Sequence, residues 1–319
     1  MKKATSLALK AAAGTALAGT ALYIGTGGLL CYGILSKKAC NKHPDELLHI
    51  RDNMKRYLRD ENFREADDWY NSINPDDTVL INEKGERLLS KIILQEKESH
   101  KWLIAVHGYT SRPRAMARQA IHFYKNGYNT VMPCQRAHRN RDEKFTSMGY
   151  YERYDVISWI NYILSMDPEA EIVLLGISMG SATVMLTTGE KLPSNVKCCI
   201  ADCGYTNCYE LFTRSIKREA GLPPFPFVGA ANTFAKLFLG WSFKDCSPID
   251  AVSHSVTPTL FIHGEDDAVV PFAMMEALYE SCSAEKAKLA TPDTGHDEAC
   301  ANHPEKYWEA VDSFIAIYM

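Results

Sequence analysis

The chain has 319 residues, of which 46% are hydrophobic and 23% are charged, a composition typical of globular proteins with a large buried core. Its formal net charge of -4 argues against a nucleic-acid partner, because binding to phosphates usually requires an excess of Lys and Arg. None of the ten cysteines forms the C-x-x-C spacing of zinc-ribbon or thioredoxin-type sites. We therefore expect no bound metal and mostly free thiols, with Cys203 and Cys208 the pair to check for a disulfide.

The first 36 residues differ in composition from the rest of the chain. Residues 11–36 carry no charge, and about 25 such residues are enough to span a hydrocarbon core of about 30 Å as a helix. We interpret residues 1–36 as a single membrane-anchoring helix, with a cleaved signal segment and a soluble helix as the alternatives. Lysines flank both ends, so the positive-inside rule gives no clear orientation, and we favour an extracytoplasmic catalytic domain.

The remaining chain divides into a connecting helical segment at 37–75 and a larger domain at 76–319. In the larger domain, short apolar runs alternate with amphipathic stretches. The expected strands cover 78–82, 87–95, 102–106, 130–132, 172–175, 196–201, 260–262 and 288–290. The expected helices cover 115–125, 151–165, 181–190, 274–281 and 305–318. This alternation predicts an α/β fold with a mostly parallel central sheet and helices on both faces.

The stretch Gly176-Ile177-Ser178-Met179-Gly180 joins an expected strand to an expected helix. A serine at the tip of such a strand–turn–helix is held in strained backbone dihedrals, and the two glycines let neighbouring backbone pass without a Cβ clash. The pattern predicts Ser178 as a catalytic nucleophile. The alternative interpretation is a tight turn that carries an inert serine.

The interval at 205–250 interrupts the alternation, because it contains no evident strand. It is rich in apolar and aromatic residues, at 222–227 and again at 234–241. We predict a helical cap over the active-site edge of the sheet, whose side chains form the walls of an acyl or aryl pocket. The alternative is a packed helical excursion without a role in binding.

Two later loops supply the partners that a nucleophilic serine needs. A base must take the serine proton and a carboxylate must orient that base, and in a parallel sheet of this kind the acid precedes the histidine. Asp267 follows the strand at 260–262, and His296 follows the last short strand. We therefore predict Asp267 as the acid and His296 as the base, with Asp266 as the near and Asp202 as the more distant alternative acid.

The oxyanion that forms during acyl transfer needs two preorganised N–H donors. One should be the backbone N–H of Met179, directly after the nucleophile. The other should come from the loop His107-Gly108-Tyr109-Thr110, which follows the strand at 102–106. We place this second donor at the backbone N–H of Tyr109.

These motifs occur together in an order that resembles the α/β-hydrolase family over residues from about 80 to 319. The resemblance is to bacterial, often membrane-tethered hydrolases related to cinnamoyl and other carboxylesterases. It includes the His-Gly oxyanion loop, the G-x-S-x-G elbow, the strand end Asp202-Cys203-Gly204-Tyr205, the His-Gly-x-x-Asp acid loop and the late Gly-His pair. One loop departs from the pattern, because the family often carries Pro-Asp-x-Arg-Gly-His-Gly where this chain reads Pro133-Cys134-Gln135-Arg136-Ala137-His138-Arg139. The shape of that loop therefore does not carry over from the family.

The motifs and the resemblance imply a serine hydrolase that cleaves small-molecule carboxylic esters through an acyl-enzyme, without a cofactor. The apolar cap and the N-terminal segment favour lipophilic esters and contact with a membrane. A peptidase or amidase, a thioesterase or a lipase would use the same three residues, so these remain alternatives. A binding protein that kept the fold without the reaction is the alternative from another class.

Overall fold

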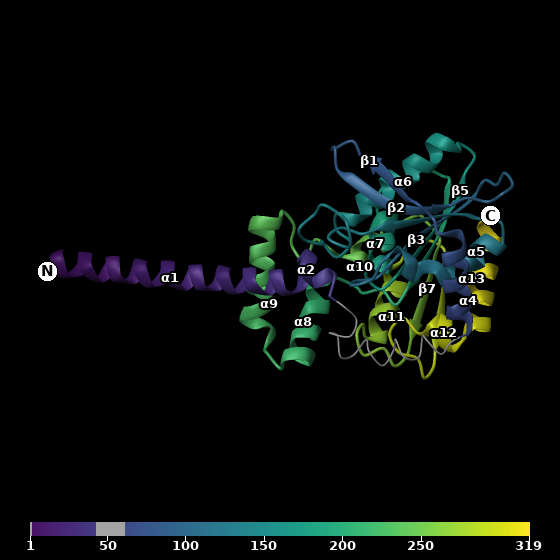
Figure 1. Ribbon diagram of the computed structural model, residues 1–319. Coiled ribbons are helices and arrows are strands. Elements are labelled where there is room, and N and C mark those ends of the chain that lie inside the picture. The colour runs from purple at the N-terminus through teal and green to yellow at the C-terminus, as the bar shows by residue number, and fades with distance from the viewer. Residues whose placement is uncertain (1, 43–60) are drawn as a thin grey trace.

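A computed structural model describes residues 2–42 and 61–319, so the middle of the connecting segment expected at 37–75 lies outside the described residues. Helix α1 (Lys2–Leu35) projects from the body of the molecule, and α2 (Lys37–Cys40) follows it (Figure 1). Within α1, Leu17–Leu35 has a mean hydropathy of 1.4 and is long enough to cross a bilayer. By length and composition such a helix fits a membrane anchor, a signal sequence or a helix of a soluble protein.

The body is built on one sheet with the strand order β1-β2-β4-β3-β5-β6-β7-β8. The strands are β1 (Asp77–Ile81), β2 (Arg87–Ile93), β3 (Lys101–Val106), β4 (Asn129–Cys134), β5 (Glu171–Ile177), β6 (Val196–Asp202), β7 (Thr259–Gly264) and β8 (Lys286–Thr291). β2 pairs antiparallel with β1 and with β4, and the strands from β4 to β8 are parallel. The predicted mostly parallel sheet is confirmed.

Helices cover both faces of the sheet, which explains why the central strands are apolar on both sides. One face carries α4 (Glu61–Ile73), the 3-10 turn η2 (Pro113–Met116), α5 (Ala117–Lys125), α12 (Ala299–Asn302) and α13 (Pro304–Tyr318). The other carries α6 (Glu152–Met166), α7 (Met179–Thr188), α10 (Pro248–Val252) and α11 (Phe272–Ser281). Along β3, Leu103 and Ala105 pack into the first core and Trp102 and Ile104 into the second, because successive side chains of a strand point to opposite faces.

Between β6 and β7 the chain forms helices, in the interval where the sequence showed no strand. They are α8 (Cys208–Ala220), α9 (Pro224–Phe234), the π-helical segment η3 (Ala235–Leu239) and α10. The Asn207 side chain caps α8 by accepting the N–H of Glu210 at 2.7 Å. A proline at the first position of α9 suits a helix start, where its missing N–H costs nothing.

Helix α1 is packed into this cap at its C-terminal end. Cys31 and Leu35 of α1 share a buried cluster with Leu211 of α8 and Val228 of α9. The thiol of Cys31 donates to the backbone oxygen of Ala231 at 3.3 Å. The C-terminal part of α1 therefore packs against the cap, while its N-terminal part extends away from the body (Figure 1).

The state of the cysteines and the bounds of two elements test the predictions made from the sequence. All ten cysteines are buried and free, so the prediction of free thiols is confirmed and Cys203 and Cys208 form no disulfide. The weak strand expected at 288–290 is the longer edge strand β8, and the helix expected at 115–125 is divided into η2 and α5. These differences change the lengths of elements and leave their order as predicted.

Candidate active site

Ser178 lies in the sharp turn between β5 and α7, in a backbone conformation that side chains rarely adopt. Its φ is 57° and its ψ is -116°. The turn is tight because α7 starts against the end of β3: a Cβ on Gly180 would lie 1.9 Å from the backbone oxygen of Val106. Strain of this kind persists only where the surrounding structure imposes it, and here it exposes the serine hydroxyl above the sheet.

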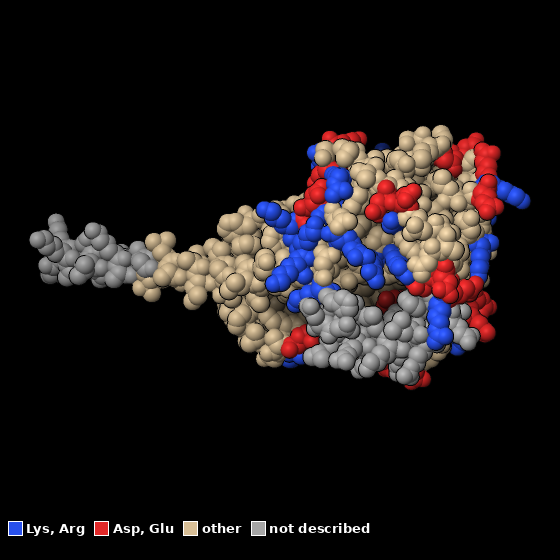
Figure 2. Space-filling view, in the orientation of Figure 1, with Lys and Arg blue, Asp and Glu red and all other residues tan. Residues whose placement is uncertain are grey.

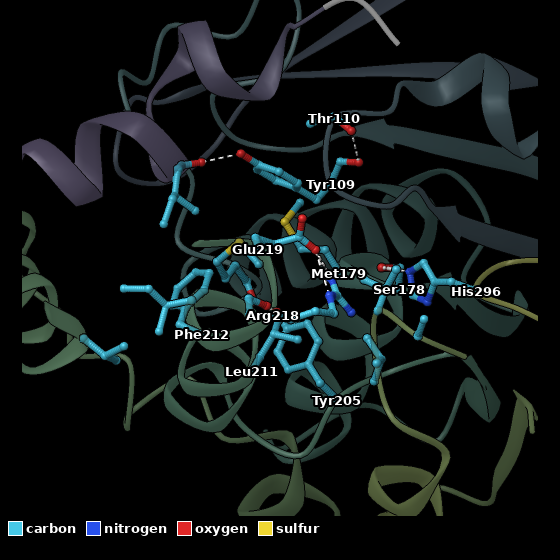
Figure 3. Close-up of a pocket in the computed structure, with 18 of the residues that line it drawn as sticks. Tyr109, Thr110, Ser178, Met179, Tyr205, Leu211, Phe212, Arg218, Glu219 and His296 are labelled. Atoms are coloured by element: carbon cyan, nitrogen blue, oxygen red, sulfur yellow. Dashed lines mark hydrogen bonds and ion pairs between the residues drawn. The ribbon is translucent and has the colours of Figure 1, made fainter. Parts of the chain in front are cut away.

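The structure brings the three predicted side chains into one hydrogen-bonded chain. The loop after β8 places Nε2 of His296 2.8 Å from Oγ of Ser178. The loop after β7 places Oδ2 of Asp267 2.7 Å from Nδ1 of His296. Figure 3 shows Ser178 and His296 pointing toward one another at one side of a pocket. A base is thus in contact with the serine hydroxyl and is itself oriented by a carboxylate.

The electrostatic environment keeps Asp267 ionised. Its Oδ1 accepts the backbone N–H groups of Val269 and Val270, both at 2.8 Å, and Nε2 of His263 lies 3.1 Å from its Oδ2. Burial opposes ionisation, but the charge of His296 and hydrogen bonds from both histidines hold the pKa of Asp267 well below its usual range. Burial also opposes protonation of His296, but the charge and hydrogen bond of Asp267 outweigh it and raise the pKa of His296 above 6.5.

The two alternative acids lie in different surroundings. Asp266 is exposed at the rim of the same pocket, one residue before the carboxylate that contacts His296. Asp202 is buried at the end of β6, where it accepts the hydroxyl of Tyr307 at 3.0 Å. Burial, reinforced by the charge of Asp297, raises the pKa of Asp202 to about 7. Of the three candidates, Asp267 is therefore the one whose geometry and charge suit the orientation of His296.

The two predicted oxyanion donors border the same pocket as Ser178. Tyr109 and Met179 both line it, and the loop of Tyr109 passes close to the nucleophile, since a Cβ on Gly108 would lie 3.4 Å from Cβ of Ser178. Within the part of the chain that the structure describes, no acceptor engages the backbone N–H of Tyr109 or of Met179. Both donors are therefore available to a substrate oxygen, as an oxyanion hole requires.

Two buried histidines hold the loop that carries Tyr109, a role that no pattern in the sequence indicated. Nε2 of His138 accepts the N–H of Thr110 at 3.1 Å, and Nε2 of His107 accepts the N–H of Gln135 at 3.1 Å. Burial, with a smaller contribution from His138, lowers the pKa of His107 to about 3, and burial also lowers that of His138. Both rings are therefore neutral and act as hydrogen-bond acceptors. His138 and Gln135 belong to the loop that departs from the family pattern.

A cavity of about 660 Å³ extends from Ser178 toward the cap and α1. Its apolar wall includes Leu30 and Ile34 of α1, Leu211, Phe212 and Ile216 of α8, and Val228 of α9. The hydroxyl of Tyr109 donates to the backbone oxygen of Ile34, which links the oxyanion loop to α1. Figure 3 shows Leu211 and Phe212 on the side of the pocket away from His296. The space beyond the serine hydroxyl is therefore large and apolar.

The sequence profile of the prolyl oligopeptidase family matches residues 115–318, more than half of the chain. The chain belongs to the prolyl oligopeptidase family. Together with the sheet and the solved esterases of the same fold, this membership identifies it as an α/β-hydrolase and a serine hydrolase.

Three relatives illustrate the range within this fold. The uncharacterized protein YqkD of Bacillus subtilis is 27% identical over 214 residues, which cover 67% of this chain and 70% of YqkD. The Pyrococcus furiosus esterase Pf2001 is 25% identical with a TM-score of 0.62, covering 77% of this chain and 91% of the esterase. An acylaminoacyl peptidase of Pyrococcus horikoshii is 17% identical with a TM-score of 0.58, covering 76% of this chain and 41% of the peptidase.

Proposed function

We propose that this family member hydrolyses carboxylic esters with lipophilic acyl groups, using Ser178 as nucleophile, His296 as base and Asp267 as the orienting acid. The observation that carries the proposal is the unbroken hydrogen-bonded chain of these three side chains at the end of an apolar cavity. The likeness to an esterase over most of both chains supports the choice of ester substrates.

In the proposed reaction, His296 takes the proton of the Ser178 hydroxyl while Oγ attacks the ester carbonyl carbon. The negative charge moves to the carbonyl oxygen, where the N–H groups of Tyr109 and Met179 donate to it. As the tetrahedral intermediate collapses, His296 gives its proton to the departing alcohol and an acyl-serine remains. Water, deprotonated by His296, then attacks the acyl carbon, and the returning proton restores the serine. Asp267 stabilises the imidazolium in both halves of the cycle.

A peptidase activity is the second candidate, because the family profile and one solved neighbour are those of peptidases. The two activities differ in the leaving group, because an amine is a poorer leaving group than an alcohol and depends more on protonation by the acid form of His296. The apolar lining of the cavity favours an acyl chain over a polar peptide backbone, which would leave its N–H and C=O groups without partners.

We further propose that residues 1–36 anchor the protein in a membrane, that 37–75 connect the anchor to the body, and that 76–319 form the catalytic domain with its cap at about 205–250. The uncharged run at 11–36 supports the first part. The helices between β6 and β7 that border the cavity support the last. We favour an extracytoplasmic position for the catalytic domain.

The test compares Ser178→Ala with Ser181→Ala in the full-length protein, on a p-nitrophenyl ester series and on p-nitroanilides with matched acyl groups. Ser181 is a suitable control because its buried hydroxyl has no partner among the described residues, so its loss should be nearly neutral. Ser178→Ala should lower turnover by about four or more orders of magnitude. Equal turnover in the two variants would remove Ser178 from the mechanism, and faster cleavage of anilides than of esters would favour the peptidase.

A further inference from the structure

The cap and α1 present adjoining uncharged surfaces at one end of the molecule. Residues 11–36 of α1 and residues 220–235 of the cap contain no charged side chain. Figure 2 shows the surface around the point where α1 leaves the body without charged groups, and side chains of both charge signs at its border. A continuous exposed apolar area marks an interaction surface, and next to a helix long enough to cross a bilayer it fits contact with lipid.

Helix α9 crosses α1 and is the element of the body nearest to the projecting part of α1 (Figure 1). The crossing is close, since a Cβ on Gly27 would lie 2.1 Å from the backbone oxygen of Ala230. Figure 1 shows α9 running across the axis of α1, so where α1 spans a bilayer α9 lies along its surface. On its outer side Phe225 is 79% exposed, and in the following η3 Leu237 and Phe238 are 60% and 62% exposed.

The length of the uncharged run places this crossing at the membrane boundary. Residues 11–36 extend over about 39 Å as a helix, at about 1.5 Å per residue. The hydrocarbon core is about 30 Å thick, so about 9 Å of the run lies beyond it. Gly27 lies 16 residues, or about 24 Å, after residue 11, so with residue 11 at the far boundary the contact with α9 lies about 6 Å inside the near one, within the about 5–10 Å to which interfacial helices are buried.

The same helices form the wall of the cavity that leads to Ser178. Leu30 and Ile34 come from α1, and Leu222 and Val228 from the start of α9 and the residues before it. Helix α1 and the start of α9 therefore border both the cavity and the surface that would meet the lipid. An acyl chain that entered beside them would lie against mostly apolar side chains, with Arg218 and Glu219 among the charged residues of the lining.

We propose that α9 and η3 rest in the bilayer surface with Phe225, Leu237 and Phe238 among the acyl chains, and that a membrane-resident ester with a long acyl chain enters the cavity beside α1. The bilayer is the partner of this surface. The docking is inferred from the exposed apolar side chains and the α1–α9 contact, while the entry of the ester rests on the proposed ester hydrolase function.

Docking is tested with the full-length protein in phosphatidylcholine vesicles that carry brominated acyl chains, which quench nearby indoles. The variants are Phe238→Trp and, as a matched control, Ile317→Trp. Ile317 is 70% exposed on α13, near the C-terminus that lies at the end of the body opposite α1 (Figure 1). After subtraction of the parent protein with its five native tryptophans, the indole at 238 should lose about half of its emission and that at 317 almost none. Equal quenching at both positions would refute docking, whatever the activity.

Entry is tested with Leu237→Asp and Ile317→Asp on two esters, p-nitrophenyl palmitate held in the vesicles and water-soluble p-nitrophenyl butyrate. Leu237 does not line the cavity, so a charge there should slow palmitate hydrolysis about tenfold by lifting the cap from the bilayer, with butyrate hydrolysis unchanged. Ile317→Asp should change neither rate. Equal effects of Leu237→Asp on both esters would refute entry from the bilayer. Failure of the parent protein to cleave either ester, with indole 238 still quenched, would refute the esterase and leave the docking in place.

Discussion

The contact between α1 and α9 can be tested by adding one methyl group, in Gly27→Ala. The new Cβ would lie 2.1 Å from the oxygen of Ala230, whereas real Cβ contacts stay above 3.0 Å, so the two helices must separate by about 0.9 Å. Overpacking of this kind costs about 1–3 kcal/mol, and the higher helix propensity of alanine returns about 1 kcal/mol. We expect a net destabilisation of up to about 2 kcal/mol, or up to about 30-fold in an equilibrium constant.

The chain offers two matched controls for this variant. A Cβ on Gly25 or on Gly33 meets no atom within 4 Å, so Gly25→Ala and Gly33→Ala change helix propensity without the clash. The assay is kcat/KM of each full-length variant on p-nitrophenyl laurate and acetate. Because α1 forms a distant wall of the cavity, Gly27→Ala should lower kcat/KM for laurate about tenfold and leave acetate nearly unchanged. If Gly27→Ala behaves like the two controls, α1 does not pack against α9 as described.

Three further substitutions address the site itself. Asp267→Asn should lower kcat by about four orders of magnitude, because the imidazole loses its orienting partner. Because His296 must be neutral to act as a base and Asp267 raises its pKa, kcat/KM of the variant should also rise at a lower pH than that of the parent protein. His138→Phe should leave the N–H of Thr110 without an acceptor and lower kcat about tenfold at unchanged KM. Because unfolded protein would lower kcat in the same way, the folded fraction is measured by circular dichroism, and an unchanged kcat in folded protein would contradict this role. Asp202→Asn should keep activity within a few-fold. Because the pKa of Asp202 is raised to about 7, the folded parent protein binds an extra proton between about pH 4 and 7. The melting temperature of the parent protein should therefore fall relative to that of the variant as pH rises through that window.

The positions of Ser178, Asp267 and His296 could be expected from sequence because each follows a recognisable strand. In a parallel sheet the carboxyl ends of neighbouring strands meet at one edge, so the loops after β5, β7 and β8 converge there regardless of the distance between them along the chain. The sequence alone could not decide between Asp266 and Asp267 as the acid. Adjacent carboxylates look alike in sequence, and only the backbone of the loop turns one of them toward His296 and the other toward solvent.

The support of the oxyanion loop could not be expected in the same way. His138 reaches the N–H of Thr110 and His107 reaches that of Gln135, and in both pairs the partner is a backbone amide 28 residues away. Every residue carries such an amide, so no residue pattern marks the partner. The helical cap was predicted, but its packing partner was not. Helix α9 is apolar around most of its circumference, so no periodic face marks the side that packs against α1, about 200 residues earlier.

The packing of α1 favours its retention over removal as a signal sequence. Leu35 is fully buried and its backbone oxygen accepts the N–H of Thr146 at 2.9 Å, while that of Ile34 accepts the hydroxyl of Tyr109. Without α1 the N–H of Thr146 and the hydroxyl of Tyr109 would lose these partners. The cavity at Ser178 would also lose a wall. A segment made to be cut away has no need of such contacts, so the packing favours our interpretation of residues 1–36 as a retained anchor over the alternative of a cleaved signal segment.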